Sequence, residues 1–211
     1  MERKQIFDNI TTFCKAREVE FDTISKGRQA QLKVLSDYLS AKYQIGETPK
    51  VIIICTHNSR RSHLGQLWLA VGADYFGLPQ LATYSGGTEA TAFNLRAVAA
   101  LQQVGFDIQT ADNEATNPRY EVKWSDNMPP YIAFSKKYEN APNPTKGFVG
   151  VMVCTDADVN CPIVFGMDLR LTLPFEDPKA FDNTTQEAQM YGERCEQIAR
   201  EFLFVLKNVK L

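Results

Sequence analysis

One short segment of this chain combines residue types that suit chemistry on an anion. Residues 55–62 read CTHNSRRS, and they follow directly on a β-branched run at residues 51–54. Apolar residues with a period near 3.6 begin after the segment, which is therefore predicted to connect a buried strand to a helix. Backbone N–H groups of such a loop and of the helix N-terminus converge on one concavity that binds anions. The expected oxyanion site comprises Thr56, His57, Asn58, Ser59, Arg60 and Arg61.

The side chains of this loop predict a nucleophile and a clamp for an oxyanion. The field of the helix N-terminus favours the thiolate of Cys55, so its pKa is expected below the free value of about 8.5. Arg61 can hold two oxygens of a tetrahedral oxyanion with its planar guanidinium. Ser62 can donate its hydroxyl to the thiolate. A buried cysteine beside a solvent-facing arginine is the alternative, and the spacing within a strand-to-helix turn argues against it.

The chain has five cysteines, too few and too scattered for a secreted disulfide framework. Cys14 and Cys195 lie on predicted apolar helix faces and are expected to pack in the core. Cys154 and Cys161 stand seven positions apart after a predicted strand. They are either core residues or chemically active thiols. A zinc site is disfavoured because no Cys-x2-Cys pair is present and both histidines lie in or just after the cysteine loop.

The rest of the chain predicts strands and helices that alternate around this loop. Strands are expected at residues 51–54, 82–84, 148–153 and 168–173, and helices at residues 61–75, 94–104 and 184–209. This alternation predicts a parallel sheet packed with helices. Ser25 is the expected N-cap of the second N-terminal helix, and Gly105 is expected to end the helix at residues 94–104. Thr184 with Glu187 fits a capping box at the start of the helix at residues 184–209.

Two segments stand outside the alternation. Residues 1–46 show apolar spacing typical of two amphipathic helices, and residues 119–124 with 131–134 suggest a β-hairpin. We therefore expect a helical extension at residues 1–46 and an α/β domain at residues 47–211, with an insertion at residues 112–147.

Composition excludes several classes of protein. Lys and Arg number 23 against 25 Asp and Glu, for a net charge of −2, so no nucleic acid or membrane partner is expected. The longest aliphatic run, residues 51–54, falls far short of the roughly 20 apolar residues that a membrane helix needs. The N-terminal residues are charged and do not resemble a signal peptide. We expect a soluble, cytoplasmic protein.

The loop at residues 55–62 resembles the signature loop of the low-molecular-weight protein tyrosine phosphatase superfamily, which includes the thioredoxin-coupled arsenate reductases. The similarity extends over most of residues 50–211, through YSGGTE at residues 84–89 to FEDP at residues 175–178. It implies a four-stranded parallel sheet flanked by helices, and no cofactor or metal. It also implies that Asp177, the aspartate before a proline, is the general acid. The nearby acids Asp168, Glu176 and Asp182 are expected to be solvated surface charges.

The resemblance to the arsenate reductases implies a relay of three thiols. Cys55 would attack arsenate, and Cys154 would then attack the Cys55 sulfur as arsenite leaves. Cys161 would next attack Cys154, which leaves a disulfide for thioredoxin to reduce. Because a disulfide needs Cα atoms about 4.4–6.8 Å apart, residues 156–160 are expected to rearrange during the cycle.

Two positions depart from the family pattern. His57 stands where glycine is usual, and Arg60 stands where a small residue or a second cysteine is usual. His57 could point outward, lower the pKa of Cys55 when charged, or narrow the mouth against a phosphotyrosine ring, which would favour arsenate. Arg60 adds positive potential near the anion, and its side chain is expected to face solvent. Asn58 matches the family's loop-shaping asparagine, which tolerates a left-handed backbone.

These residues favour reduction of arsenate to arsenite with thioredoxin as the electron donor. The alternative is hydrolysis of phosphate monoesters, such as phosphotyrosine, by Cys55, Arg61 and Asp177. A third hypothesis is a non-catalytic protein that binds an oxyanion or a phosphopeptide through the same loop.

Overall fold

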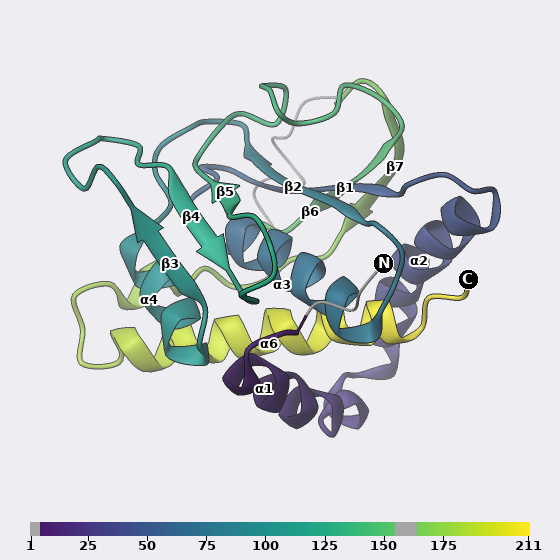
Figure 1. The fold of residues 1–211 in the computed structure, drawn as a ribbon, viewed down its shortest axis with the longest axis horizontal. Helices are drawn as coiled ribbons and strands as arrows, with labels where there is room; N and C mark the ends of the chain where they lie inside the picture. The colour runs from purple at the N-terminus through teal and green to yellow at the C-terminus, as the bar shows by residue number, and fades with distance from the viewer. Residues whose placement is uncertain (1–4, 155–163) are drawn as a thin grey trace.

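A four-stranded sheet forms the centre of the molecule in the computed structural model, which describes residues 5–154 and 164–211 (Figure 1). Its strands are β1 (Lys50–Cys55), β2 (Ala82–Gly87), β6 (Phe148–Met152) and β7 (Met167–Thr172). They lie in the order β2-β1-β6-β7, and every neighbouring pair is parallel. The predicted parallel sheet is confirmed, and the cysteine loop leaves it at the carboxyl end of the central strand β1.

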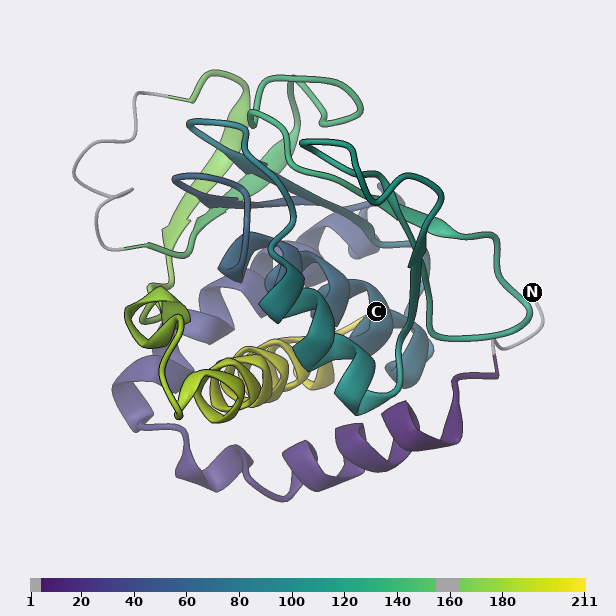
Figure 2. The same ribbon diagram turned by 90° about the vertical axis from the view of Figure 1, so that its left-hand side faces the viewer.

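Five α-helices lie within the described residues and pack against this sheet and one another. They are α1 (Asp8–Glu18), α2 (Lys26–Gln44), α3 (Arg61–Phe76), α4 (Leu95–Val104) and α6 (Glu187–Lys207), with short 3₁₀ helices at Phe21–Thr23 and Pro178–Phe181. Helix α6 contacts α1, α2, α3 and α4, and Figure 2 shows it between the sheet and α1. The predicted pair of N-terminal helices is confirmed, and both share one apolar core with the sheet and α6. The division of the chain between residues 46 and 47 stays a prediction.

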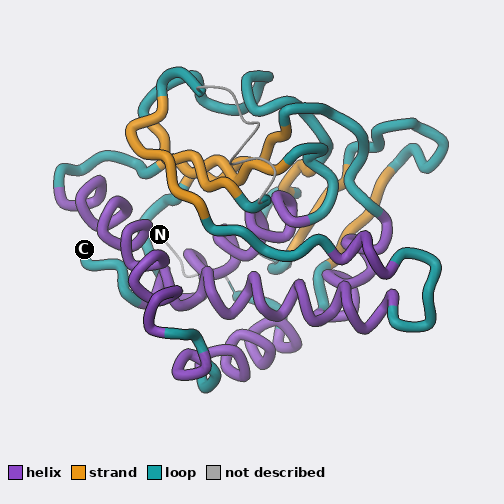
Figure 3. Tube along the Cα trace, turned by 180° about the vertical axis from the view of Figure 1, so that it is seen from behind, coloured by secondary structure: helices purple, strands orange, loops and turns teal. Residues whose placement is uncertain are grey.

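The two faces of the sheet are covered differently. The described helices gather on one face, as the view from behind shows (Figure 3). The other face buries Ile52, Ile54, Phe148 and Met152 under loop residues that include Val164. Among the helices of residues 5–154 and 164–211, none is long and apolar enough to cross a bilayer.

The predicted hairpin is present and is part of a larger sheet. Strands β4 (Tyr120–Lys123) and β5 (Tyr131–Ala133) pair antiparallel, and β3 (Asp107–Thr110) adds to the other edge of β4. The sequence did not predict β3 because only one of its four residues, Ile108, is buried, which gives no alternating pattern.

The predicted N-cap of α2 is confirmed, whereas the predicted start of α6 is wrong. Ser25 caps α2 by accepting a hydrogen bond from the backbone N–H of Arg28, as predicted. The capping box at Thr184 is wrong: α6 begins only at Glu187, and the Thr184 hydroxyl donates to the carbonyl of Phe181 instead. The Glu187 carboxylate accepts from the backbone N–H of Asn183, so both side chains serve the turn before the helix.

Candidate active site

Cys55 lies at the end of β1, with its sulfur at the floor of the loop that leads into α3. Its Sγ is 3.0 Å from the Oγ of Ser62, and Asn58 Nδ2 donates to that same Oγ at 2.9 Å. Because the Ser62 oxygen already accepts from Asn58, its proton is free to point at the sulfur. All three residues are buried, so this short chain of hydrogen bonds is shielded from water.

The loop takes its shape from Asn58 and from the segment around residue 135. Asn58 has a left-handed backbone with φ of 44°, and its Oδ1 accepts from the backbone N–H of Lys136 at 2.8 Å. The carbonyl of His57 accepts from the hydroxyls of Thr91 at 3.0 Å and of Ser135 at 3.1 Å. Thr91 and the segment that follows the hairpin therefore fix the loop through neutral hydrogen bonds.

The glycine at the end of β2 permits this close packing. A Cβ on Gly87 would lie 2.6 Å from the carbonyl oxygen of Thr56 and 2.7 Å from the backbone nitrogen of Asn58. Real Cβ atoms essentially never approach that closely, so only glycine lets β2 lie against the cysteine loop.

His57 fits the loop although the family usually has glycine there. Among the non-glycine residues of the described chain, only Asn58 and Asn183 have a positive φ. The backbone at His57 therefore has a negative φ, which does not require glycine. Its side chain is half exposed, with Nε2 3.6 Å from a carboxylate oxygen of Glu89. His57 therefore lies at the rim of the site.

The surroundings of Cys55 favour its thiolate. The thiol of Cys154 donates a hydrogen bond to the Cys55 sulfur, which is the largest of the effects that lower the pKa of Cys55. Burial opposes this, and the Ser62 hydroxyl, the Ser59 backbone N–H and the charge of Arg61 lower the pKa further. The net direction is downward, so Cys55 is a nucleophile at neutral pH.

Cys154 has the opposite preference. Its hydrogen bond to Cys55, burial and the negative charge of the Cys55 thiolate all raise its pKa. The Thr56 hydroxyl lies 3.9 Å from its sulfur, and the residue is almost fully buried. The structure thus brings Cys154 beside Cys55 as a thiol. Cys161 lies outside the described residues, as do residues 156–160.

Arg61 and Asp177 meet across the mouth of the loop. Arg61 Nη2 is 2.6 Å from Asp177 Oδ2, and Nη1 donates to the carbonyl of Phe175 at 2.7 Å. The other carboxylate oxygen of Asp177 accepts from the backbone N–H of Lys179 at 3.0 Å. One small open pocket is lined by Cys55, Thr56, His57, Ser59, Arg60, Arg61 and Asp177.

Two expectations about charged residues are wrong. Arg60 was expected to face solvent, but its side chain is only 12% exposed and pairs with Asp182 at 3.2 Å. Its Nε donates to the Tyr191 hydroxyl at 2.6 Å, and that hydroxyl donates to Asp182 at 2.7 Å. Asp182 is therefore no solvated surface charge. The reason is that the start of α6 packs against the loop and encloses both groups.

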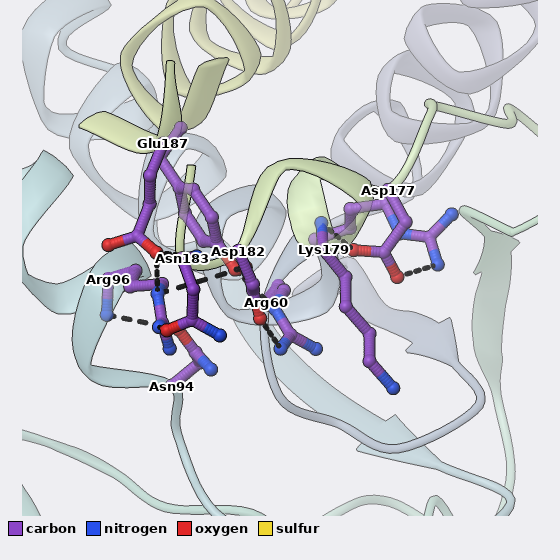
Figure 4. A network of polar contacts seen from close by, with 10 residues as sticks. Arg60, Asn94, Arg96, Asp177, Lys179, Asp182, Asn183 and Glu187 are labelled. Carbon is purple, nitrogen blue, oxygen red and sulfur yellow. Dashed lines mark hydrogen bonds and ion pairs between the residues drawn. The ribbon is translucent and has the colours of Figure 1, made fainter. Parts of the chain in front are cut away.

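The contacts of Arg60 extend into a wider polar network, which Figure 4 shows. Arg96 of α4 binds Glu187 at 2.6 Å and donates to Asn183 at 2.8 Å. Sequence reasoning missed Tyr191, whose position one helical turn after Glu187 was the available signal. The network joins the cysteine loop, α4 and the segment that carries Asp177.

The remaining predicted residues lie away from the pocket. Glu176 is exposed, and Asp168 is partly exposed and accepts from Tyr38 at 3.0 Å. Cys14 and Cys195 are buried in the core as expected, where burial raises the pKa of each thiol to about 12. That packing position leaves both thiols protonated at neutral pH.

Known proteins resemble this chain in sequence. Arsenate reductase 2 of Staphylococcus haemolyticus is 30% identical over 128 residues, which are 61% of this chain and 77% of that protein. Arsenate reductase of Bacillus subtilis is 29% identical over 150 residues, which are 70% of this chain and 87% of that protein. No family model matches the chain.

Solved structures share the fold. An arsenate reductase in the phosphate-binding state matches with a TM-score of 0.52 at 19% identity, over 77% of this chain and 100% of that chain. A low molecular weight protein tyrosine phosphatase from T. tengcongensis matches with a TM-score of 0.52 at 16% identity, over 77% and 100%. The sheet and its helices therefore define the low molecular weight phosphatase fold. Within that fold, the sequence relatives show that this chain belongs to the arsenate reductase family.

Proposed function

We propose that this protein reduces arsenate to arsenite through Cys55, Cys154 and Cys161, with thioredoxin as the electron donor. The observation that carries the proposal is that the buried Cys154 follows β6, whose neighbour β1 ends at Cys55, and that its sulfur lies 3.9 Å from the hydroxyl of Thr56, the residue after Cys55. A phosphatase needs one cysteine only, whereas a reductase needs a second thiol within reach of the first. The relatives named arsenate reductase support the same substrate.

In the first step, arsenate enters the pocket and its oxygens compete with Asp177 for Arg61. The Cys55 thiolate attacks arsenic, a sulfur–arsenic bond forms, and one arsenate oxygen leaves as water. The leaving oxygen already carries one proton of arsenate, and Asp177, which takes a proton from solvent once Arg61 has released it, supplies the second. Ser62, Arg61 and the loop N–H groups hold the remaining charge.

In the second step, two of the effects that keep Cys154 protonated are gone. The Cys55 thiolate raises the pKa of Cys154 by accepting its hydrogen bond and by its negative charge, and both effects end once the Cys55 sulfur is bonded to arsenic. Cys154 loses its proton to an arsenic-bound oxygen, its thiolate attacks the Cys55 sulfur, and the sulfur–arsenic bond breaks with its electron pair on arsenic. Arsenite leaves, and the two thiols are oxidised to a Cys55–Cys154 disulfide.

In the third step, Cys161 attacks the sulfur of Cys154 and restores Cys55. The resulting Cys154–Cys161 disulfide is reduced by thioredoxin, which closes the cycle. This step is proposed from the sequence, since Cys161 lies outside the described residues.

The test measures arsenate turnover with thioredoxin, thioredoxin reductase and a nicotinamide donor. We expect turnover to be lost in Cys154→Ser and in Cys161→Ser. Cys195→Ser is the matched control, because Cys195 is equally buried but does not line the pocket, and it should keep full turnover. Full arsenate turnover in Cys154→Ser would contradict the relay.

Hydrolysis of phosphate monoesters is the second candidate function, since Cys55, Arg61 and Asp177 line one pocket. It uses no second thiol, so p-nitrophenyl phosphate hydrolysis should survive in Cys154→Ser. Ester hydrolysis without any arsenate turnover in the wild-type protein would select the phosphatase. Oxyanion binding with neither turnover would select the non-catalytic binder.

A further inference from the structure

The segment that carries Asp177, residues 174–182, is held by arginines from several parts of the chain. Arg61 binds Asp177 and the Phe175 carbonyl, and Arg60 binds Asp182. A further arginine, Arg28, comes from the N-terminal helices and binds the start of the segment. The proposed mechanism uses the first of these arginines and leaves Arg28 without a role.

Arg28 contacts the segment in two ways. Its Nη2 donates to the carbonyl of Pro174 at 3.1 Å, and its guanidinium lies 4.9 Å from the ring centroid of Phe175. The side chain sits in the first turn of α2, which Ser25 caps through the backbone N–H of Arg28 itself. The N-terminal helices therefore reach the active-site segment at a defined point.

A buried carboxylate fixes the direction of the Arg28 guanidinium. Its Nε is 2.7 Å from Glu201 Oε2 on α6, and the two side chains are 15% and 5% exposed. Gln197 also donates to Glu201 at 3.1 Å, which holds the carboxylate. Because Glu201 neutralises Arg28 locally, Arg28 is not expected to compete with Arg61 for an anion.

The contact lies close to the acid along the chain. Phe175 is buried, and its ring packs against Phe202 of α6 with centroids 6.2 Å apart. The carbonyl of the same residue is a partner of Arg61, and Asp177 follows two positions later. A shift of residues 174 and 175 would therefore move a partner of Arg61 and the acid together.

We propose that Arg28 is a positioning residue that keeps Asp177 at the pocket when an oxyanion takes Arg61 away from it. This rests on the proposed role of Asp177 as the acid. Once the Arg61–Asp177 pair opens, the segment keeps Arg28 at its start and Arg60 at its end. The N-terminal helices thereby contribute to catalysis without touching the substrate.

A double-mutant cycle between Arg28 and Asp177 tests the proposal. We expect Arg28→Met to lower kcat for arsenate about tenfold, and Asp177→Asn to lower it more. In the Asp177→Asn background, Arg28→Met should have no further effect, because there is no acid left to position. The alkylation rate of Cys55 by iodoacetamide needs the thiolate and no acid, so it should stay unchanged in Arg28→Met.

The matched control is Arg17→Met. Arg17 is also an arginine of the N-terminal helices, 12% exposed, and it pairs with Glu20 and with Glu196 of α6 away from the acid segment. It should keep wild-type kcat. Arg28→Lys keeps a charge for Glu201 but lacks the two-sided guanidinium, so it should be intermediate, and it replaces Arg28→Met in the cycle if that variant fails to fold.

The outcomes separate the inference from the proposed function. An equal loss from Arg28→Met in both backgrounds, or an equal loss in Arg17→Met, would mean that the helices only stabilise the fold. Wild-type kcat in Asp177→Asn would mean that Asp177 is not the acid, and the proposed role of Arg28 would then fail as well. Only a loss that depends on Asp177 supports positioning by Arg28.

Discussion

The cysteine loop and the segment that carries Asp177 face each other across one pocket but are held by different forces. Neutral hydrogen bonds hold the loop, among them the buried contacts of Asn58 with Ser62 and with the backbone of Lys136. Contacts with arginines hold much of the acid segment, among them the ion pairs of Asp177 and Asp182, and the carboxylate of Asp177 is one-third exposed. The two halves of the site therefore differ in how easily they rearrange.

This difference matches what each half must do. The loop must present an unchanged set of N–H and O–H donors to a thiolate and an oxyanion, so fixed donors are an advantage. The acid segment must give up Arg61 when an anion arrives and must still keep Asp177 near the leaving oxygen. The Arg61–Asp177 pair is partly exposed and can exchange partners, whereas the enclosed Arg60–Asp182 pair retains the end of the segment.

The largest expected effect compares the two halves directly. Cys55→Ser should lower arsenate turnover by about 10⁴-fold or more, because no other group replaces the thiolate. Asp177→Asn should lower it by about 10²-fold to 10³-fold, since water can supply the proton less well. Both are measured as kcat with thioredoxin in excess, with circular dichroism to show that each variant is folded. Similar losses for the two variants would contradict the proposal that Cys55 is the indispensable nucleophile and Asp177 a replaceable proton donor.

The second effect concerns the stability of the loop. Asn58→Ala should lower the free energy of unfolding by about 3 kcal/mol. It leaves the buried Ser62 hydroxyl and the Lys136 backbone N–H without their hydrogen bonds to Asn58, and it places alanine at a positive φ. Asn183→Ala is the matched control: Asn183 also has a positive φ, of 63°, but is exposed on the acid-segment side. It should lose about 1 kcal/mol. Urea unfolding measures both, and equal losses would show that the buried hydrogen bonds add nothing.

The third effect concerns the contact between the two thiols. Cys154→Ala removes the donor that most lowers the pKa of Cys55, so that pKa should rise by about one to two pH units. The pH dependence of Cys55 alkylation by iodoacetamide measures it, and the rate below neutral pH should fall. Cys154→Ser keeps a hydroxyl donor and should show a smaller rise. An unchanged pKa in Cys154→Ala would mean that the loop alone holds the thiolate.

The loop was predictable from the sequence because its chemistry is local. Cys55, Asn58, Arg61 and Ser62 lie within eight consecutive positions, and the strand before them and the helix after them have clear apolar patterns. The sheet followed from the same alternation, whereas β3 did not, since one buried residue makes no pattern.

The supports of the acid segment were not predictable in the same way. Arg28 and Glu201 are 173 positions apart, and Arg60 and Tyr191 are 131 apart. A polar stretch of sequence predicts that its arginines and aspartates are solvated. For this reason the sequence predicts solvent-exposed side chains at Arg60 and Asp182, which the structure shows to be enclosed. Only the packing of α6 against both the loop and α2 makes these side chains partners.

The smallest expected effect lies at the rim, where the two halves meet solvent. His57→Gly should change the free energy of unfolding by less than about 1 kcal/mol, because the side chain is half exposed and its backbone has no positive φ to relieve. Arsenate is small, so its turnover should change less than about twofold. A phosphotyrosine ring must pass the imidazole, so aryl phosphate hydrolysis should rise by about threefold to tenfold.

Glu89→Gln separates crowding at the rim from charge, because it removes the carboxylate that lies 3.6 Å from His57 and leaves the imidazole in place. If His57 acts by its bulk, Glu89→Gln should leave both activities near wild type while His57→Gly changes only the aryl substrate. A tenfold loss of arsenate turnover in His57→Gly would instead mean that the imidazole acts on the thiolate or on the anion. His57 would then be a functional part of the cysteine loop, so the half of the site that must keep a fixed geometry would extend to the rim.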